Sequence, residues 1–326
     1  MRVLVTGASG MLGRAVAEAL VGRGEDVTVL QRGAAGVAGA REVRGSVTEP
    51  DVVTRAVAGQ DAVVHLAAKV GVTGSLADFE AVNVRGTRRL LDAARAAGVS
   101  RFVHVSSPSV AHTGTSIVGE GAGPADPSRA RGSYARTKAA AELEALGAHA
   151  AGFAVVAVRP HLVWGPGDTQ LVQRVVERAA AGRLPVVGTG APLVDTCYVD
   201  NAVDALLAAL DRAEQAGGEA FVVTDGAPRA IADVMGGWCR AAGVAAPSWH
   251  VPAGLARTAG SVVEALWGLL PERVVGDDVP PMTRFLAEQL STAHWFDLRR
   301  TREVLGWEPR VSVEEGLERL TRAFRR

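Results

Sequence analysis

Two side chains with complementary acid–base chemistry, Tyr134 and Lys138, lie four residues apart. In a helix this spacing puts both on one face, one turn apart. A phenol with an ordinary pKa of about 10 exchanges protons poorly at neutral pH. An ammonium group a few ångströms away, in a partly desolvated cleft, lowers that pKa toward the working range. Tyr134 and Lys138 therefore form a candidate catalytic pair.

A tyrosine and a lysine also occur four residues apart by chance, so the surrounding sequence decides how strongly this pair indicates a catalytic site. Tyr134 is one of only two tyrosines, and both a glycine-rich turn and a strand-end serine precede it in the chain. Residues 101–105 are predicted to form an apolar strand, which delivers Ser106 and Ser107 at its end. For either serine, the alternative role is that of a helix or turn cap.

The glycine-rich turn lies near the start of the chain, between a predicted buried strand and a predicted helix. Residues 2–6 form a β-branched apolar run, residues 7–13 are rich in glycine, and apolar residues at helical spacing continue to Gly22. A second strand is predicted over residues 27–30. Strand, glycine turn, helix and strand form the opening unit of a dinucleotide-binding fold.

The three main glycines of this turn have separate physical tasks. Gly7 allows the tight turn, Gly10 lets backbone N–H groups approach a pyrophosphate, and Gly13 lets the helix pack closely on the strand. The helix N-terminus adds its partial positive charge. Glycine makes up 38 of 326 residues, so the pattern alone is weak. Its place between a strand and an amphipathic helix favours dinucleotide binding over a turn without a ligand.

The second strand ends in a neutral residue, Gln31, followed by Arg32. An acidic residue at this place would hold the adenosine ribose hydroxyls of NAD, whereas an arginine can pair with a 2′-phosphate. The sequence therefore predicts NADP(H) in preference to NAD(H), with NAD(H) left open. The alternative is that Arg32 is merely exposed at a strand end.

A third apolar strand is predicted over residues 61–68, and it ends in small side chains that leave room for a cofactor. His65 lies within this apolar run and is expected to be a hydrogen-bonded core residue rather than a catalytic one. Asn83 is expected to cap the following helix and to support the site from behind. An alanine-rich helix over 139–146, a helix over 171–181, a strand over 194–198 and a helix over 202–210 capped by residues 200–201 complete the prediction.

The whole composition restricts the class of partner. Lys plus Arg equals Asp plus Glu at 35 each, so nucleic acid is not expected as a partner. Cys197 and Cys239 lie far apart without metal-ligand spacing, which favours a reducing cytoplasm and no metal site. Met1 leads directly into a strand, so no signal peptide is expected. Residues 251–270 are apolar but interrupted by Arg257 and Glu264, which indicates an amphipathic helix with at most weak membrane-surface contact.

Several segments together resemble the extended short-chain dehydrogenases/reductases, the NAD-dependent epimerase/dehydratase superfamily. The resemblance covers nearly the whole chain and rests on residues 6–13, Ser107, residues 134–138, 159–167, 198–201 and 305–309. Within this family the chain looks most like the 3β-hydroxysteroid dehydrogenase branch. Residues 106–110 and 281–287 are most similar to bacterial 2-alkyl-3-oxoalkanoate reductases, which serve lipid synthesis.

The resemblance implies a mechanism and a set of site residues. Lys138 would hold the nicotinamide ribose and lower the pKa of Tyr134, which would protonate the substrate carbonyl oxygen, while Ser107 would hydrogen-bond that oxygen. A homodimer formed through the helices near Asn83 and Tyr134 is also implied. The implied cofactor-binding residues are Gly7, Ser9, Gly10, Met11, Leu12, Gly13, Gln31, Arg32, Ser46, Val47, Leu66, Ala67, Ala68, Lys138, Pro160 and His161.

The sequence departs from the family pattern at three places. Ser46 stands where an aspartate usually holds adenine, and Trp164 stands where tyrosine is commoner. The lipid reductases continue their serine motif with an aromatic and an acidic residue, whereas here the chain runs Ala111-His112-Thr113-Gly114. The first departure weakens the adenine contact, and the last leaves the exact substrate open.

We therefore expect an α/β fold, a doubly wound parallel Rossmann sheet with a smaller, mainly helical substrate lobe. Residues 1–165, with 194–226 returning to them, would bind the cofactor, and residues 166–193 and 227–326 the substrate. The expected reaction interconverts a ketone and a secondary alcohol on an apolar substrate, first a long-chain 2-alkyl-3-oxo acid and second a 3-hydroxysteroid. The alternatives are a nucleotide-sugar epimerase or dehydratase with tightly bound NAD, and a non-enzymatic cofactor-binding protein.

Overall fold

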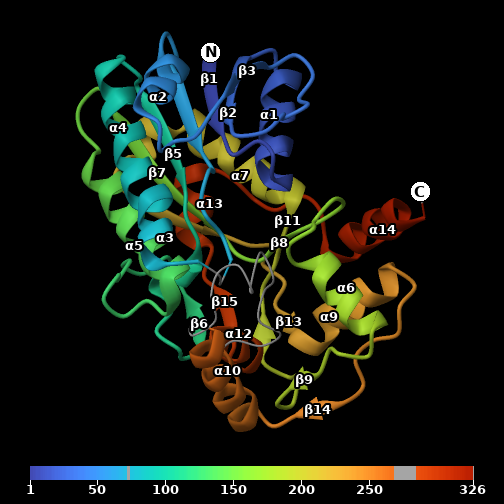
Figure 1. Cartoon of the computed structure of the whole chain (residues 1–326). Coiled ribbons are helices and arrows are strands. Elements are labelled where there is room, and N and C mark those ends of the chain that lie inside the picture. The colour runs from blue at the N-terminus through green and yellow to red at the C-terminus, as the bar shows by residue number, and fades with distance from the viewer. Residues whose placement is uncertain (72–73, 268–283, 326) are drawn as a thin grey trace.

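The computed structural model describes residues 1–71, 74–267 and 284–325, and its largest element is a seven-stranded parallel sheet (Figure 1). The strand order is β3-β2-β1-β4-β5-β7-β12, which reverses direction between β1 and β4. This order confirms the predicted doubly wound sheet. The strands are β1 (Arg2–Thr6), β2 (Asp26–Gln31), β3 (Arg41–Arg44), β4 (Ala62–His65), β5 (Arg101–Val105), β7 (Ala154–Pro160) and β12 (Ala220–Val223).

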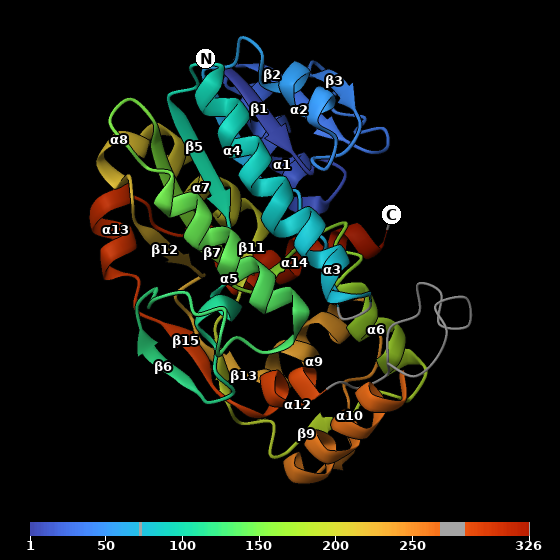
Figure 2. The same cartoon turned by 60° about the vertical axis from the view of Figure 1, so that its left-hand side comes forward.

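Helices cover both faces of this sheet, and β1 shows how its residues are shared between them. Val3 and Val5 pack in the core with α1 and α7, whereas Leu4 packs in the core with α2 and α4. This alternation is why the strands are apolar throughout. Figure 2 shows α4 and α5 side by side on their face of the sheet. The covering helices are α1 (Met11–Gly22), α2 (Pro50–Val57), α4 (Thr87–Ala96), α5 (Gly132–Gly147), α7 (Val199–Asp211), α8 (Ala213–Ala216) and α13 (Arg299–Leu305).

A second region packs against the carboxyl ends of the strands and combines helices with short strands (Figure 1). A four-stranded sheet has the order β13-β10-β15-β6, and two pairs, β8 with β11 and β9 with β14, stand apart. Its helices are α6 (Val172–Ala180), α9 (Ile231–Ala241), α10 (Ala253–Trp267), α12 (Arg284–Ser291) and α14 (Val313–Phe324). Its strands are β6 (Ile117–Glu120), β8 (Val163–Trp164), β9 (Val186–Val187), β10 (Leu193–Val194), β11 (Cys197–Tyr198), β13 (Arg229–Ala230), β14 (His250–Val251) and β15 (His294–Phe296). The short helix α3 (Leu76–Phe79) belongs to the sheet region, where it contacts α5.

The single strand predicted over 194–198 is wrong. The chain forms two short strands, β10 and β11, which belong to different sheets. Asp195 lies between them and turns toward the loop after β12, where its carboxylate accepts hydrogen bonds from Thr224 Oγ1 at 2.6 Å and from the Ala227 N–H at 3.2 Å. These long-range bonds interrupt the strand, and local apolar pattern does not reveal them.

Two predicted helices begin earlier than expected. The helix predicted over 202–210 is α7, which begins at Val199, so Asn201 lies inside it instead of capping it. The Asn201 amide donates to Asp225 and to the Val311 carbonyl, each at 2.8 Å, which explains why this polar residue is buried in a helix. The alanine-rich helix is α5, which begins at Gly132 and thus includes both Tyr134 and Lys138. The helix predicted over 171–181 is confirmed as α6.

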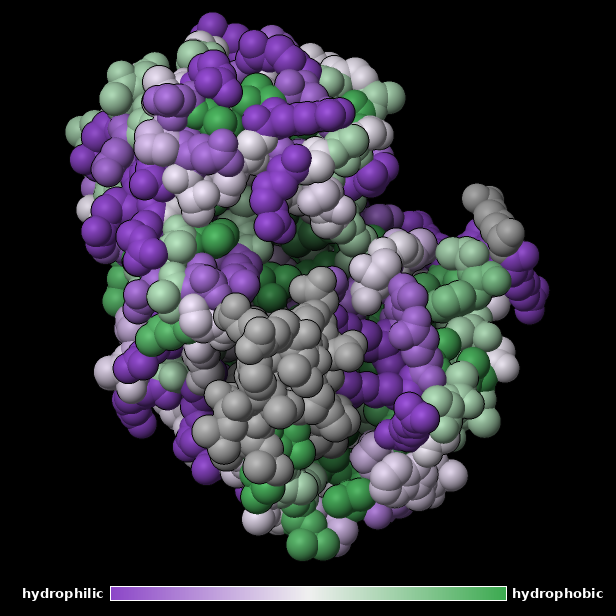
Figure 3. Space-filling view, viewed as in Figure 1, coloured by the Kyte–Doolittle hydropathy of each residue, from purple (hydrophilic) through white to green (hydrophobic). Residues whose placement is uncertain are grey.

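The predicted amphipathic helix over 251–270 corresponds in part to α10, and residues 268–270 lie outside the described residues. Its exposed apolar side chains include Leu255 at 64% and Val262 at 53% exposure. Apolar residues gather at the base of the molecule, where α10 lies (Figure 3). Within the described ranges, no helix has the length and apolar character needed to cross a membrane.

Candidate active site

The predicted glycine turn joins β1 to α1 at the carboxyl edge of the sheet. Gly7 has φ +80°, and a Cβ there would lie 2.8 Å from the Ala67 backbone nitrogen. A Cβ on Gly13 would lie 2.3 Å from the Gly7 carbonyl oxygen. On Gly10, at the N-cap of α1, a Cβ would approach only the Gly7 oxygen, at 3.7 Å. Packing thus explains Gly7 and Gly13, while Gly10 leaves open space in front of a helix N-terminus, as a pyrophosphate requires.

Three further residues of this turn lie at the surface or close to it, whereas Ala8 is buried. Ser9 is exposed, Met11 and Leu12 are half-buried, and all three lie at or next to the first residues of α1. Their backbone N–H groups belong to the end of the helix that carries partial positive charge.

The end of β2 offers a buried acceptor and an exposed cation. Gln31 Nε2 donates to the Gly33 carbonyl at 2.9 Å, but its buried Oε1 has no partner among the described residues. An orphaned acceptor at this place fits a hydroxyl donor such as that of an adenosine ribose. Arg32 is exposed and makes no ion pair with any described residue. The fit of Gln31, together with the open space at Gly10, agrees with a bound dinucleotide.

The segment after β3, residues 46 and 47, has fewer groups that could contact the adenine than the family pattern has. Ser46 Oγ already accepts bonds from the Thr48 N–H and hydroxyl, at 3.1 and 2.8 Å. The Val47 side chain is 5% exposed and packs in the core, so only its backbone faces outward. Neither side chain supplies the carboxylate that the family usually has there.

The end of β4 is lined by Leu66, Ala67 and Ala68, which are all half-buried. Thr6 Oγ1 accepts a hydrogen bond from the Ala67 N–H at 3.0 Å, which ties the ends of β1 and β4 together at the switch point. His65 is confirmed as a core residue, because its ring nitrogens bond to Thr6 and Thr87 at 2.7 and 3.0 Å. Burial lowers its pKa to about 3, so the ring stays neutral.

The three predicted catalytic residues lie together at the end of β5. Ser107 lies near enough to Tyr134 to act on the pKa of its phenol, which it lowers. Its Oγ accepts hydrogen bonds from the Ser109 N–H and hydroxyl, at 3.3 and 3.0 Å, and caps a short 3₁₀ turn (Pro108–Ala111). Lys138 is 4% exposed, and its Nζ donates to the Val105 carbonyl at 2.5 Å. Ser106 Oγ is buried with no partner in the described part of the chain. Ser107, and not Ser106, is therefore the serine that meets the tyrosine.

The electrostatics of the pair differ from the expectation. Burial raises the pKa of Tyr134 to about 12, and Ser107 opposes that rise. Lys138 is not among the groups that cause this shift, and its Nζ donates to the Val105 carbonyl. Burial lowers the pKa of Lys138 to about 8, with Glu142 one turn along α5 acting to raise it. The predicted lowering of the tyrosine pKa is thus wrong, and Tyr134 is a neutral proton donor at pH 7.

Asn83 does not cap a helix, because it lies inside a π-helical segment (Glu80–Gly86). Its amide donates to Thr137 Oγ1 at 3.0 Å and to the Lys69 carbonyl at 3.1 Å, and its oxygen accepts from the Lys69 N–H at 2.7 Å. Thr137 is adjacent to Lys138 on α5. Asn83 therefore ties the loop after β4 to the helix that carries Tyr134 and Lys138.

The end of β7 places Pro160 and His161 beside the same edge. His161 is 7% exposed, and its Nδ1 bonds to the Asp195 carbonyl at 2.5 Å. Burial lowers its pKa to about 4, so the ring is neutral. The next residue, Leu162, has φ +45°, a strained value for a residue with a Cβ. The bend at Leu162 directs the chain away from β7 into the second region.

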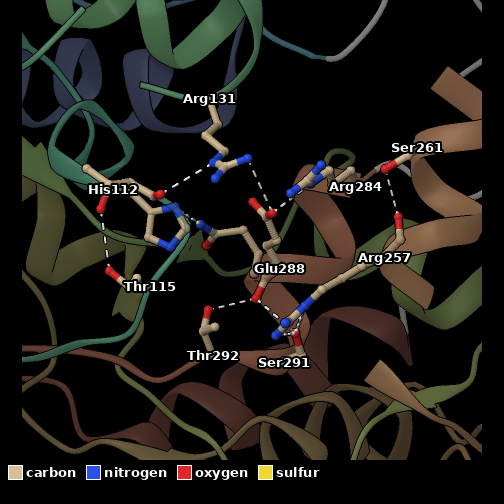
Figure 4. Close-up of polar contacts among 11 residues, drawn as sticks. His112, Thr115, Arg131, Arg257, Ser261, Arg284, Glu288, Ser291 and Thr292 are labelled. Atoms are coloured by element: carbon tan, nitrogen blue, oxygen red, sulfur yellow. Dashed lines mark hydrogen bonds and ion pairs between the residues drawn. The ribbon is translucent and has the colours of Figure 1, made fainter. Parts of the chain in front are cut away.

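Sequence reasoning missed a polar cluster on the opposite side of the site. Arg131 and Glu288 point toward one another from the start of α5 and from α12 (Figure 4). His112 of the loop after Ser107 lies beside them, with its ring bonded to Gln289 and His294. The one local signal was that Arg131 precedes Tyr134 by three residues. The contact with Glu288, 157 positions further along, leaves no trace in local sequence pattern.

Comparison with known proteins places this geometry in a family. Residues 3–224 match the model of the NAD dependent epimerase/dehydratase family. The chain belongs to this family. It is an extended short-chain dehydrogenase/reductase, an enzyme of the oxidoreductase type that acts on CH–OH groups.

Individual members of the family are similar over nearly the whole chain. A 2-alkyl-3-oxoalkanoate reductase of Stenotrophomonas maltophilia is 42% identical, covering 98% of each chain. A 3-beta-hydroxysteroid dehydrogenase of Mycolicibacterium neoaurum is 30% identical, covering 97% of this chain and 89% of that protein. Among solved structures, MoeE5 in complex with UDP-glucose and NAD has a TM-score of 0.77 at 25% identity, covering 100% of this chain and 99% of the other.

Proposed function

We propose that this enzyme uses NADPH to reduce the ketone of a long-chain 2-alkyl-3-oxo acid to a secondary alcohol. The observation that carries the proposal is that Ser107 lies close enough to Tyr134 to act on its pKa, with Lys138 one turn further along α5, at the carboxyl edge of the sheet. The proposal is supported by the similarity to a protein named 2-alkyl-3-oxoalkanoate reductase.

In this proposal the chain supplies the proton and holds the reacting oxygen. When bound, the reduced nicotinamide supplies a hydride to carbonyl carbons. Tyr134, whose raised pKa of about 12 keeps it protonated at neutral pH, donates the proton to the substrate oxygen. Ser107 donates a hydrogen bond to the same oxygen and stabilises the charge that develops there. Lys138 gives one N–H to the Val105 carbonyl and keeps others for ribose hydroxyls.

The cofactor would lie along the carboxyl ends of β1, β2, β4, β5 and β7. Gly7, Gly10 and Gly13 would accommodate the pyrophosphate, and Gln31 with Arg32 the adenosine ribose and its 2′-phosphate. Leu66, Ala67 and Ala68 would line its middle part. Pro160 and His161 would lie near the nicotinamide, where the buried neutral imidazole of His161 leaves Nε2 as a hydrogen-bonding group.

We assign cofactor binding to residues 1–165 and 194–226, and substrate binding to residues 166–193 and 227–326. The apolar side chains of α10, including the half-buried Val263, suit an alkyl chain better than a sugar diphosphate. A diphosphate would require several basic groups that converge on one point.

The proposal is tested by following NADPH oxidation with a long-chain 2-alkyl-3-oxo acid, with a matched 3-oxosteroid run in parallel. We expect rapid consumption with the acid and little with the steroid. NADPH oxidation with the steroid alone would indicate that the enzyme is a 3-hydroxysteroid dehydrogenase. No consumption with either substrate, together with NAD retained through purification, would contradict the proposal in favour of nucleotide-sugar epimerisation or dehydration.

A further inference from the structure

A polar cluster lies where α5 begins, in contact with α12 of the second region (Figure 4). Arg131 is the N-cap residue of α5, and its Nη1 lies 3.7 Å from Glu288 Oε1 on α12. Arg284 Nε donates to the same carboxylate oxygen at 2.9 Å. Glu288 is thus shared by two guanidinium groups, and Arg131 has the longer contact of the two.

The position of Arg131 is tied to the catalytic residues from two sides. Arg131 is the N-cap residue of α5 and Tyr134 is the third residue of its first turn, and residues at these two positions lie close together at a helix start. Arg131 Nε donates to the Thr113 carbonyl at 3.3 Å, and Thr113 follows Ser107 by six residues in the chain. Arg131 is thus joined to Tyr134 through the first turn of α5 and to the loop after Ser107 through Thr113, while its guanidinium group reaches α12.

The backbone is shaped around this guanidinium group. Gly114 has φ +93°, and a Cβ there would lie 2.8 Å from Arg131 Nε. Any other residue at position 114 would displace the arginine. His112 lies close to both charged groups. Burial lowers the pKa of His112, the charge of Glu288 raises it, and the charge of Arg131 lowers it. The group is thus held in place by Thr113, Gly114 and Glu288.

Arg131 nevertheless keeps binding capacity. Its side chain is 40% exposed, and its Nη2 has no hydrogen-bond partner among the described residues. Glu288, by contrast, is 4% exposed, and its buried Oε2 is without a partner in the described part of the chain. A guanidinium group with free N–H groups, anchored by a buried carboxylate, is suited to bind a second carboxylate from solution.

We propose that Arg131 binds the carboxylate of the acid substrate and is the residue that selects acids over neutral ketones. The inference rests on the proposed function, because it concerns the substrate of that same site. In a 2-alkyl-3-oxo acid the carboxyl carbon is two bonds from the carbonyl carbon. The group that holds the carboxylate must therefore lie close to the groups that hold the ketone oxygen, and Arg131 caps the turn of α5 that carries Tyr134.

The test compares the acid with its methyl ester, which keeps the ketone and the chains but removes the charge. For Arg131→Gln we expect KM for the acid to rise about 50-fold, since a hydrogen bond to a charged group is lost. We expect kcat for the acid and both constants for the ester to change less than about threefold. Arg131→Lys, which keeps the charge but loses the planar fork, should lie between wild type and Arg131→Gln.

A matched control is available in the same loop. Arg129 is exposed and lies two residues before Arg131, so Arg129→Gln should alter neither substrate. Equal losses on acid and ester in Arg131→Gln would show that Arg131 only supports the fold of the site, and an unchanged KM for the acid would equally overturn the inference. A wild-type enzyme that reduces neither compound would instead overturn the proposed function, and this inference with it.

Discussion

The sheet side of the site consists of glycine, alanine and serine at strand ends. The side that faces the second region, called the lobe side below, consists of Glu288 on α12 with Arg131 and His112, which come from the sheet region but point toward it. On the sheet side, Gly7 and Gly13 are in backbone contact with their neighbours, and Gly10 leaves open space. On the lobe side, Arg131 meets Glu288 across two elements far apart in the chain.

This difference follows from what each side has to bind. Backbone N–H groups and small residues fit a dinucleotide, whose shape does not vary between enzymes of the family. Charged side chains on loops and on α12 can differ between relatives without disturbing the sheet, and they discriminate between substrates by charge. We infer that the sheet side determines the reaction and the lobe side determines the substrate.

The largest effect on turnover should come from Tyr134, which lies where the two sides of the site meet. Tyr134→Phe removes the proton donor, and we expect turnover to fall by about 10³-fold or more while cofactor affinity stays nearly unchanged. Steady-state assays and cofactor titration measure the two quantities. Tyr198→Phe, at the other tyrosine of the chain, is the control and should retain turnover. Substantial turnover in Tyr134→Phe would remove the tyrosine from the mechanism.

Two alanine substitutions on the sheet side separate packing from binding. Gly13→Ala forces a Cβ to 2.3 Å from the Gly7 oxygen, so we expect a loss of about 3 kcal/mol in unfolding free energy. Gly10→Ala meets no atom closer than 3.7 Å, so its stability should fall by about 1 kcal/mol or less. Its cofactor affinity should nevertheless fall by about 10-fold, because the Cβ occupies the pyrophosphate space. Denaturant unfolding and cofactor titration distinguish these outcomes. Normal cofactor affinity in Gly10→Ala would contradict the assignment.

Acid should destabilise the molecule through its buried histidines. Burial lowers the pKa of His161 to about 4, below its unfolded value of about 6.5. The unfolded chain therefore binds more protons in this window, and stability falls as pH falls from about 6.5 to about 4. His161 alone should contribute a loss of about 3 kcal/mol at pH 4. Urea unfolding at several pH values measures the slope, which should be shallower in His161→Asn. An identical slope in wild type and variant would exclude His161 as the cause.

The smallest effect concerns the choice between the two nicotinamide cofactors. Arg32 is exposed at the end of β2, so Arg32→Ala should not affect folding. We expect the Kd for NADPH to rise about 10-fold, because a charge-assisted contact to a 2′-phosphate is lost, and the Kd for NADH to change little. Fluorescence titration with both cofactors measures the ratio. Equal losses for NADPH and NADH would refute the 2′-phosphate assignment.

Much of the sheet side could be predicted because its signals are local. The apolar run of β1, the glycines that follow it and the spacing of Tyr134 and Lys138 all lie within short windows of sequence. The family resemblance added Ser107 and the mechanism. The position of Asn83 inside a π-helical segment is not a local property, because its amide is satisfied by Thr137 and Lys69.

The lobe side could not be predicted because its contacts join distant segments. The break between β10 and β11 depends on bonds from Asp195 to the loop after β12, and the Arg131–Glu288 contact joins α5 to α12. The predicted lowering of the Tyr134 pKa was wrong for a related reason. Spacing places Lys138 on the same helical face, but only the packed structure shows that Tyr134 is buried, and burial raises its pKa.

The central claim is that hydride passes from NADPH to the ketone carbon of the acid and stays there. The most direct test supplies NADPH that carries two deuterium atoms at C4 of the nicotinamide, with the long-chain 2-alkyl-3-oxo acid. Mass spectrometry of the product should find one deuterium, on the carbon that bears the new hydroxyl group. An alcohol product without deuterium, or an acid recovered unchanged, would contradict the account.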